Sequence, residues 1–267
     1  MRRRTLLAGA VVGSAAAIAG VWLREHDGAG AVAVRPSAPP GDERVERRHS
    51  EARGREVEFY TAVPEGFGDG RGLPVCLVLH GGSKRPGDFA GVGLGGFLTE
   101  AARRGGTPFV LAGATGDRLA WQPDGRDDPQ RMVREELPAW CAERGFDSSR
   151  LAAWGWSMGG YGSLLLAETF PGFVRAVAAF SPAVSPGDAV FDGVGRLAGT
   201  PIGLWCGRDD SLYDNVRELR KALPEAPAAG GYRDGDHNFG YWSREIPAAF
   251  DFVAGALSPA EASRPSG

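Results

Sequence analysis

The sequence predicts an α/β protein built on a doubly wound, mostly parallel sheet flanked by helices, and two observations lead to that prediction. Beyond residue 56, short apolar runs rich in β-branched and aromatic residues alternate with longer segments of helical pattern. The 267 residues also leave room for one such domain once the amino-terminal segment is set aside. In doubly wound sheets ligands bind at the carboxyl ends of the strands, so functional residues are expected there.

The individual elements follow from local pattern. The expected strands cover residues 57–63, 74–79, 108–112, 151–156, 176–180, 202–206 and a segment near 231–233. The clearer helical patterns cover residues 96–104, 130–144, 158–169, 215–223 and 241–257. We therefore expect one domain over residues 56–257, followed by a flexible tail over 258–267.

Composition excludes several classes of protein. Hydrophobic residues make up 43% of the chain and charged residues 24%, which is typical of a globular protein that folds in water. The formal net charge is -3, and the arginines are scattered among acidic residues rather than grouped in a stripe. A nucleic-acid partner is therefore not expected, because the chain has no basic excess to neutralise phosphates.

Neither the cysteine spacing nor any sequence motif indicates a metal or nucleotide cofactor. Cys76, Cys141 and Cys206 do not form a C-x-x-C pair, and two of them lie in apolar, strand-like runs. We expect buried free thiols, with one disulfide as the alternative in an exported protein. The sequence contains no H-E-x-x-H, EF-hand or Walker A pattern, so we expect no cofactor.

The amino-terminal segment has the pattern of an export signal. Residues 1–4 are basic, residues 6–23 are apolar, and polar residues return at 24–27. The order Arg3-Arg4-Thr5-Leu6-Leu7 resembles a twin-arginine signal, which implies bacterial export, and Ala31-Val32-Ala33 is a suitable cleavage site. Residues 1–33 are thus predicted to be an export signal or, if uncleaved, a membrane anchor, since the stretch approaches the roughly 18 to 20 residues that span a bilayer. A buried amphipathic helix is the less favoured alternative. Residues 34–55, rich in Pro, Arg and Glu, are predicted to be a solvated linker.

A candidate nucleophile lies where an expected strand turns into an expected helix. The segment Gly155-Trp156-Ser157-Met158-Gly159-Gly160 contains G-x-S-x-G and resembles the nucleophile elbow of α/β hydrolases. Such a turn is strained and aims the serine hydroxyl into the site, and it tolerates only small residues two positions away. The alternative is that the glycines merely allow close packing while Ser157 caps the helix.

A serine hydroxyl needs a base, and histidine has a suitable pKa near neutrality. The chain has four histidines. His26 lies in the export segment, His49 in the expected linker and His80 at the end of an earlier strand. Only His237 follows Ser157, as the chain order of α/β hydrolases requires, and it lies in a turn-rich loop between the last strand and the last helix. His237 is therefore the predicted base, and a solvated loop histidine is the alternative.

The base needs an orienting carboxylate. Asp209 and Asp210 directly follow the strand 202–206, and spacing alone does not choose between them. Asp188, Asp192 and Asp214 are less well placed.

Negative charge in the transition state must be met by backbone N–H groups. One is expected from Met158, directly after the nucleophile. The other is expected from Gly82, because His80-Gly81-Gly82-Ser83 resembles the H-G-G segment that supplies it in lipases and esterases. A plain tight turn is the alternative reading of this loop.

Over residues 57–257 the chain resembles the "Putative esterase" family of α/β hydrolases, which includes esterase D (S-formylglutathione hydrolase), feruloyl esterases and mycolyltransferases of the antigen 85 type. The segments 155–162 and 176–182 and the loops at Asp210 and His237 carry the resemblance. It implies the α/β-hydrolase fold. The family's G-x-x-D pattern selects Asp210 over Asp209 and pairs it with Ser157 and His237.

The resemblance implies a serine esterase, which the export signal makes an exported one, that cleaves small-molecule acyl esters through an acyl-enzyme. Two alternatives remain: an acyltransferase that passes the acyl group to an alcohol, and a catalytically silent binding protein on the same fold. The export signal disfavours S-formylglutathione hydrolase itself, whose substrate is cytosolic. Residues 182–201 leave little room for a large lid, which disfavours long lipid substrates.

Several aromatic residues follow or flank the expected site. Trp121, Trp156, Phe239, Tyr241 and Trp242 could line a substrate pocket, although aromatic residues at such places are at least as often part of the core.

Overall fold

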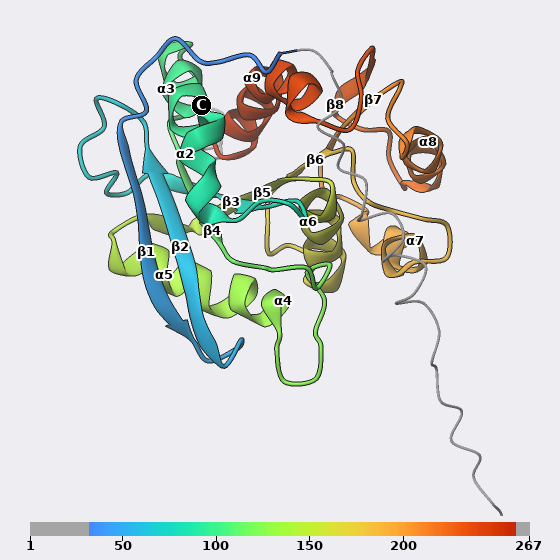
Figure 1. The fold of residues 1–267 in the computed structure, drawn as a ribbon, viewed down its shortest axis with the longest axis horizontal. Coiled ribbons are helices and arrows are strands. Elements are labelled where there is room, and N and C mark those ends of the chain that lie inside the picture. The colour runs from blue at the N-terminus through green and yellow to red at the C-terminus, as the bar shows by residue number, and fades with distance from the viewer. Residues whose placement is uncertain (1–31, 260–267) are drawn as a thin grey trace, which may run out of the picture.

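Eight strands form one sheet in the computed structural model, which describes residues 32–259. They are β1 (Asp42–Ser50), β2 (Arg55–Val63), β3 (Pro74–Leu79), β4 (Val110–Ala114), β5 (Asp147–Trp156), β6 (Val177–Phe180), β7 (Ile202–Gly207) and β8 (Ala229–Arg233). Their order across the sheet is β1-β2-β4-β3-β5-β6-β7-β8 (Figure 1). Pairing is antiparallel between β1 and β2 and between β2 and β4, and parallel elsewhere. The predicted doubly wound, mostly parallel sheet is confirmed.

Helices cover both faces of this sheet. The α-helices are α2 (Phe89–Val92), α3 (Leu94–Arg103), α4 (Pro129–Arg131), α5 (Leu137–Glu143), α6 (Met158–Thr169), α7 (Ala189–Gly193), α8 (Tyr213–Ala222) and α9 (Phe239–Ala256). Shorter turns are η2 (Pro86–Asp88) and η4 (Val194–Leu197), which are 3₁₀, and η3 (Met132–Glu136), which is π-helical. Helices α2, α3 and α9 pack on one face and α5 to α8 on the other (Figure 1).

The strands divide their side chains between the two cores. In β3, Val75, Leu77 and Leu79 belong to the core on the face covered by α5 to α8, whereas Cys76 and Val78 belong to the core on the face covered by α2, α3 and α9. Because both faces are covered, β3 is apolar along its whole length, which is why sequence pattern located it correctly. The three cysteines are buried and free, as predicted.

The predicted linker over residues 34–55 is wrong for residues 42–50. This segment is β1, an edge strand whose residues pair with β2 from Asp42 opposite Val63 to Ser50 opposite Arg55. An edge strand needs no apolar face when its backbone pairs on one side, and its charges keep other chains from adding to the edge. Its polar sequence therefore has the composition of a linker. The predicted export segment, apart from Val32 and Ala33, and the predicted tail beyond residue 259 lie outside the described residues.

Other elements differ from the prediction in their limits. The expected helix 130–144 is divided into α4, η3 and α5. Pro138 near the start of α5 has no N–H for the helical ladder, and the widened π-helical turn precedes it. The short helices α2 and α7 were not predicted. Within residues 32–259 no helix has both the length and the apolar character needed to cross a bilayer.

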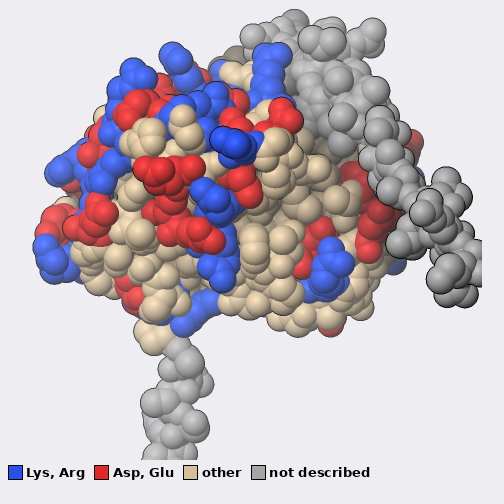
Figure 2. Space-filling view, turned by 90° about the horizontal axis from the view of Figure 1, so that it is seen from below, with Lys and Arg blue, Asp and Glu red and all other residues tan. Residues whose placement is uncertain are grey.

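Surface charges of both signs are mixed. On the face shown in Figure 2, basic and acidic side chains alternate over short distances and do not separate into fields of one sign. Many charged side chains of residues 32–259 form ion pairs, as in Arg48 with Glu143 at 2.7 Å and Arg44 with Asp42 at 2.6 Å. This face therefore offers no continuous basic stripe for a phosphate backbone.

Candidate active site

Ser157 occupies a strained turn between β5 and α6. Its φ of 54° and ψ of -121° are unfavourable for a residue with a side chain. Neighbouring segments hold it there: the Ser157 N–H donates to the Phe180 carbonyl oxygen at 2.9 Å, and its own carbonyl accepts from the Ala183 N–H at 3.0 Å. The predicted strand–turn–helix context is present.

Three glycines, which have no side chain, allow this turn to form. A Cβ on Gly155 would overlap the Gly159 carbonyl oxygen, and a Cβ on Gly159 would overlap the Leu79 carbonyl oxygen. A Cβ on Gly160 would lie 3.0 Å from the Phe180 carbonyl oxygen. Glycine at these positions lets α6 close against the ends of β3, β5 and β6.

His237 connects Ser157 to Asp210. Its Nε2 lies 2.9 Å from Ser157 Oγ, and its Nδ1 lies 2.9 Å and 3.0 Å from the two carboxylate oxygens of Asp210. The carboxylate accepts a hydrogen bond from the Nδ1–H group, which leaves Nε2 free to accept the serine proton. Asp210 also accepts from the Leu212 N–H at 2.8 Å. Ser157 and Asp210 are buried, and 10% of the His237 side chain is exposed.

The structure brings Asp210, not Asp209, to His237. Asp209 is exposed, and its carboxylate accepts from the Gly235 N–H at 3.3 Å. Gly207 allows the loop that contains His237 to pack against the end of β7, because a Cβ at this position would overlap the Gly235 carbonyl oxygen. The geometry thus selects the aspartate that spacing alone left open.

The two predicted oxyanion donors lie on separate elements. Met158 is the first residue of α6, and Gly82 lies in the loop after β3. Within residues 32–259 neither N–H has a hydrogen-bond acceptor. Both are therefore free to donate to a substrate oxygen, and Met158 does so from the positive end of a helix.

His80 is buried and acts on the loop that carries Gly82. Its Nδ1 donates to the Gly81 carbonyl oxygen at 2.8 Å, and its Nε2 accepts from the Gly116 N–H at 2.9 Å. Both bonds require a neutral ring, and burial lowers the pKa of His80 to about 4. Because the peptide between Gly81 and Gly82 is planar, holding its C=O also orients the Gly82 N–H. The Trp121 indole donates to the His80 carbonyl oxygen at 3.2 Å and braces the same loop.

A cleft of about 640 Å³ opens beside His237, between the loop after β3 and the start of α9. We call it the His237 cleft. It is lined by Ala33, Arg35, Ser83, Lys84, Gly87, Asp88, Gly91, Val92, His237, Asn238, Phe239 and Trp242. The Trp242 ring stands edge-on to His237, with ring centroids 4.9 Å apart.

Of the five aromatic residues considered for a pocket, only Phe239 and Trp242 line this cleft. Trp121, Trp156 and Tyr241 are core residues with at most 1% of their surface exposed. Arg35 and Lys84 were missed by the sequence analysis. Lys84 directly follows the His80–Ser83 segment, a signal that could have drawn attention to it, whereas Arg35 lies in the expected linker and carries no such signal.

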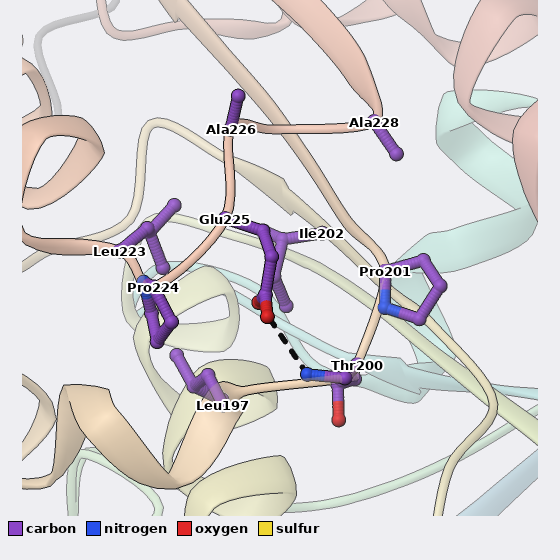
Figure 3. Close-up of a pocket in the computed structure, with 10 residues that line it drawn as sticks. Leu197, Thr200, Pro201, Ile202, Leu223, Pro224, Glu225, Ala226 and Ala228 are labelled. Atoms are coloured by element: carbon purple, nitrogen blue, oxygen red, sulfur yellow. Dashed lines mark hydrogen bonds between the residues drawn. The ribbon is translucent and has the colours of Figure 1, made fainter.

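An apolar pocket of about 240 Å³ lies away from this chemistry (Figure 3). It surrounds Ile202 at the start of β7, and Glu225 accepts from the Gly199 N–H at 3.4 Å across it. Asp210 follows the opposite end of β7, about 20 Å along the strand. The pocket is therefore separate from the triad. Within the described residues, no three His, Cys, Asp or Glu side chains are placed to hold a metal ion.

Comparison with known families agrees with this geometry. The model of the family described as "Putative esterase" matches residues 50–215, which is more than half of the chain. The chain belongs to this family. The protein is thus an esterase, as the sequence predicted. No curated protein sequence matches it.

Solved structures similar to the esterase share its fold at low identity. A ferulic acid esterase superposes with a TM-score of 0.73 at 18% identity, covering 81% of this chain and 98% of that one. An S-formylglutathione hydrolase from Agrobacterium tumefaciens gives 0.65 at 19%, covering 84% and 99%. MPT51 from Mycobacterium tuberculosis gives 0.63 at 16%, covering 82% and 100%. The esterase therefore has the α/β-hydrolase fold.

Proposed function

We propose that the protein is an exported esterase that cleaves small carboxylic esters through a triad of Ser157, His237 and Asp210 and an acyl-enzyme. The observation that carries the proposal is the position of His237, which hydrogen-bonds Ser157 Oγ through one ring nitrogen and Asp210 through the other. A histidine bonded in this way can move a proton without leaving its place.

In the acylation step, Ser157 Oγ attacks the ester carbonyl carbon while His237 Nε2 takes the hydroxyl proton. The carbonyl oxygen becomes an oxyanion, which the N–H groups of Met158 and Gly82 stabilise. The bond from carbon to the alcohol oxygen then breaks, and His237 gives the proton to that oxygen. Asp210 stabilises the imidazolium that exists between the two transfers.

In the deacylation step, water replaces the departed alcohol. His237 takes one of its protons, the hydroxide oxygen bonds the acyl carbon, and the bond to Ser157 Oγ breaks. The proton returns from His237 to Ser157. The products are one carboxylic acid and one alcohol.

A small substrate is favoured by what lies between β6 and β7. That segment contains α7 and η4, which pack against α6 and form part of the core on that face of the sheet. They leave no large insertion in residues 182–201 to enclose a long acyl chain.

The export proposal rests on sequence. Arg3, Arg4 and the apolar segment after them support a twin-arginine signal, and Ala31–Ala33 supports cleavage before Val34. Mass spectrometry of the protein recovered from the cell exterior tests this. A mature chain that starts near Val34 supports cleavage, and an intact chain held in the membrane fraction supports the anchor.

The deciding experiment is hydrolysis of p-nitrophenyl acetate, butyrate and octanoate by wild type and Ser157→Ala. We expect the variant to lose activity by about 10⁴-fold or more, with rates in wild type falling as the acyl chain lengthens. Ser149→Ala is the matched control, because that serine lies in the amino-terminal part of β5, at the other end from Ser157, and should keep wild-type rates.

Two further readouts separate the parts of the proposal. Rapid mixing with the acetate ester should release one equivalent of p-nitrophenol in a burst and increase the mass of the protein by one acetyl group. Labelling of Ser157 by a fluorophosphonate without turnover of any ester would keep the nucleophile and reject the substrate class. Absence of labelling would contradict the triad itself.

A further inference from the structure

The His237 cleft lies on the side of the site where the alcohol leaves. In the proposed mechanism His237 Nε2 protonates the departing oxygen, so the alcohol part of the ester must contact this histidine. The cleft contains His237 together with Asn238, Phe239 and Trp242 from the same loop and helix. We therefore expect groups on its walls to contact the alcohol part rather than the acyl part.

One wall of this cleft comes from residues 33–38, which we call the amino-terminal arm. The arm runs over α3 and reaches α9, as the dark-blue trace in Figure 1 shows. The Val34 N–H donates to Ser243 Oγ at 2.8 Å, and the Ser37 N–H and hydroxyl donate to Glu100 at 2.6 Å and 2.9 Å. The arm is thus bound at both ends.

Pro36 adds a packing constraint in the middle of the arm. A Cβ on Gly93 or Gly96 would come within 3 Å of the Pro36 ring, so the glycines of α3 and its cap make space for it. Next to it, Arg35 donates to the Gly91 carbonyl oxygen. These contacts hold the Arg35 guanidinium at the cleft, and the guanidinium donates one hydrogen bond there, which leaves its other N–H groups free.

The loop after β3 brings a second cation to the same cleft. Lys84 is half-buried and follows the loop that carries Gly82. Within residues 32–259, neither Lys84 nor Arg35 has a carboxylate within 4.0 Å. Asp88 is the carboxylate among the lining residues, and one of its oxygens already accepts from the Arg85 N–H at 3.0 Å. The alcohol side of the cleft thus has two cations and one partly engaged anion.

We infer that Arg35 and Lys84 select esters whose alcohol part carries a negative charge. The inference rests on the proposed function and adds its substrate class. A carboxylate on the leaving alcohol would lie in a cleft that contains two positive side chains, and the guanidinium can bind it through two N–H groups. The partly exposed Phe239 supplies apolar ring surface for an aromatic alcohol that bears this charge.

The test compares two esters that differ in this charge: 4-acetoxybenzoate, which is anionic, and methyl 4-acetoxybenzoate, which is neutral. The quantity measured is the ratio of their kcat/KM values with the full chain, divided by the ratio of their alkaline hydrolysis rates. We expect this corrected ratio to exceed one in wild type. Arg35→Gln and Lys84→Gln should each lower it about two- to fivefold, because partly exposed charge pairs have this strength.

Two further measurements, a charge-reversal variant and a change in ionic strength, test whether the preference is electrostatic. Arg35→Glu should lower the ratio further than Arg35→Gln, and raising the ionic strength from about 0.05 M to about 0.5 M should lower the ratio in wild type. Arg131→Gln on α4 is the matched control for loss of one exposed arginine and should keep the wild-type ratio. Circular dichroism melts verify that the variants are folded.

The outcomes are distinguishable. A wild-type ratio near one, or a ratio that Arg35→Gln and Lys84→Gln leave unchanged, overturns the inference while hydrolysis of both esters keeps the proposed function. Failure to hydrolyse either ester, or any p-nitrophenyl ester, overturns both. A ratio above one that falls in both variants and not in Arg131→Gln supports the anionic alcohol.

Discussion

At the scale of single residues, the neighbours Asp209 and Asp210 have the same chemistry and different surroundings. Asp210 is 4% exposed and bonded to His237, whereas the exposed Asp209 accepts from a backbone N–H of the adjacent loop. A buried carboxylate that orients an imidazole also sets which ring nitrogen holds the proton. The two residues therefore form a matched pair for testing the triad.

We expect Asp210→Asn to lower kcat by about 10³- to 10⁴-fold on p-nitrophenyl acetate, since an amide cannot stabilise the imidazolium and favours the wrong tautomer. Asp209→Asn should lower kcat less than about threefold, because its amide oxygen can still accept from Gly235. Equal losses in the two variants would contradict the assignment of Asp210.

His80 shows how a histidine next to the site can serve the reaction without touching the substrate. We expect His80→Leu to lower kcat by about 10- to 100-fold with a smaller change in KM, because the Gly82 N–H loses its fixed direction. Trp121→Phe removes only the indole bond to the His80 carbonyl and should have the smaller effect. Steady-state kinetics of both variants test this, and an unchanged kcat in His80→Leu would refute the positioning role.

At the scale of elements, the elbow depends on the contact between α6 and the end of β3. We expect Gly159→Ala to destabilise the protein by about 3 kcal/mol or more, because its Cβ would overlap the backbone of Leu79 and neither element can move alone. Gly255 in α9 is the matched control, since no atom lies within 4 Å of the Cβ position there.

Gly255→Ala should be neutral or stabilising by up to about 1 kcal/mol, as for other exposed helical glycines. Urea denaturation of both variants measures the difference. Comparable stability of the two would show that α6 can shift away from β3 and that the elbow is not sterically defined.

The hairpin of β1 and β2 also reaches the site through its turn. The Arg53 side chain is fully buried and bonds to Asp117 at 2.8 Å, to Asp127 and to the Thr115 carbonyl oxygen. Arg55 pairs with the same two aspartates at 2.5 Å and 2.6 Å. The loop held in this way contains Gly116, which bonds to His80. Residues expected to be a linker thus support the loop that bonds to His80, next to the proposed oxyanion donors.

At the scale of the whole molecule, two buried titratable groups make stability depend on pH. One, Glu168, lowers the free energy of unfolding at high pH, and the other, His80, lowers it at low pH. Burial raises the pKa of Glu168 from 4.5 to about 8, with Arg196 nearby lowering it and Asp188 raising it. The folded protein then holds a proton that the unfolded chain releases above about pH 4.5. The stability from this group is complete below that pH and is lost as pH rises through about 8.

Glu168→Gln should therefore be more stable than wild type at pH 9 and show little advantage at pH 5. The shift in pKa sets an upper bound of about 5 kcal/mol on the change in this difference. Denaturant unfolding of both proteins at the two pH values measures it, with Glu135→Gln, at an exposed site, as control. A difference that does not grow with pH would contradict a neutral Glu168 in the folded state.

The pH dependence of stability that His80 contributes is opposite to that of Glu168. The pKa of His80 is lowered from 6.5 to about 4 by burial, so the stability from its neutral ring is present above pH 6.5 and is lost as pH falls through about 4. Protonation would place an N–H against the Gly116 N–H. Acid should therefore disturb the oxyanion loop together with the fold around it.

The sequence by itself determined the sheet, the elbow and the order of Ser157 and His237 along the chain. These features are local: a buried parallel strand must be apolar on both faces, and a sharp strand-to-helix turn requires glycines at fixed positions beside the serine. Pattern therefore placed most strands within two residues of their observed limits. Residue order then made His237 the base by elimination.

Only the tertiary structure decided that β1 joins the sheet, that His80 holds the loop that carries Gly82 and that Arg35 lines the cleft. Each depends on contact between segments far apart in the chain, such as Arg35 with Gly91 and His80 with Gly116. Residue type does not encode such contacts. Polar and charged residues of the kind found in the arm and in β1 are also typical of a solvated linker. The physical reason is that packing, not local pattern, determines which polar groups are brought together and which remain in water.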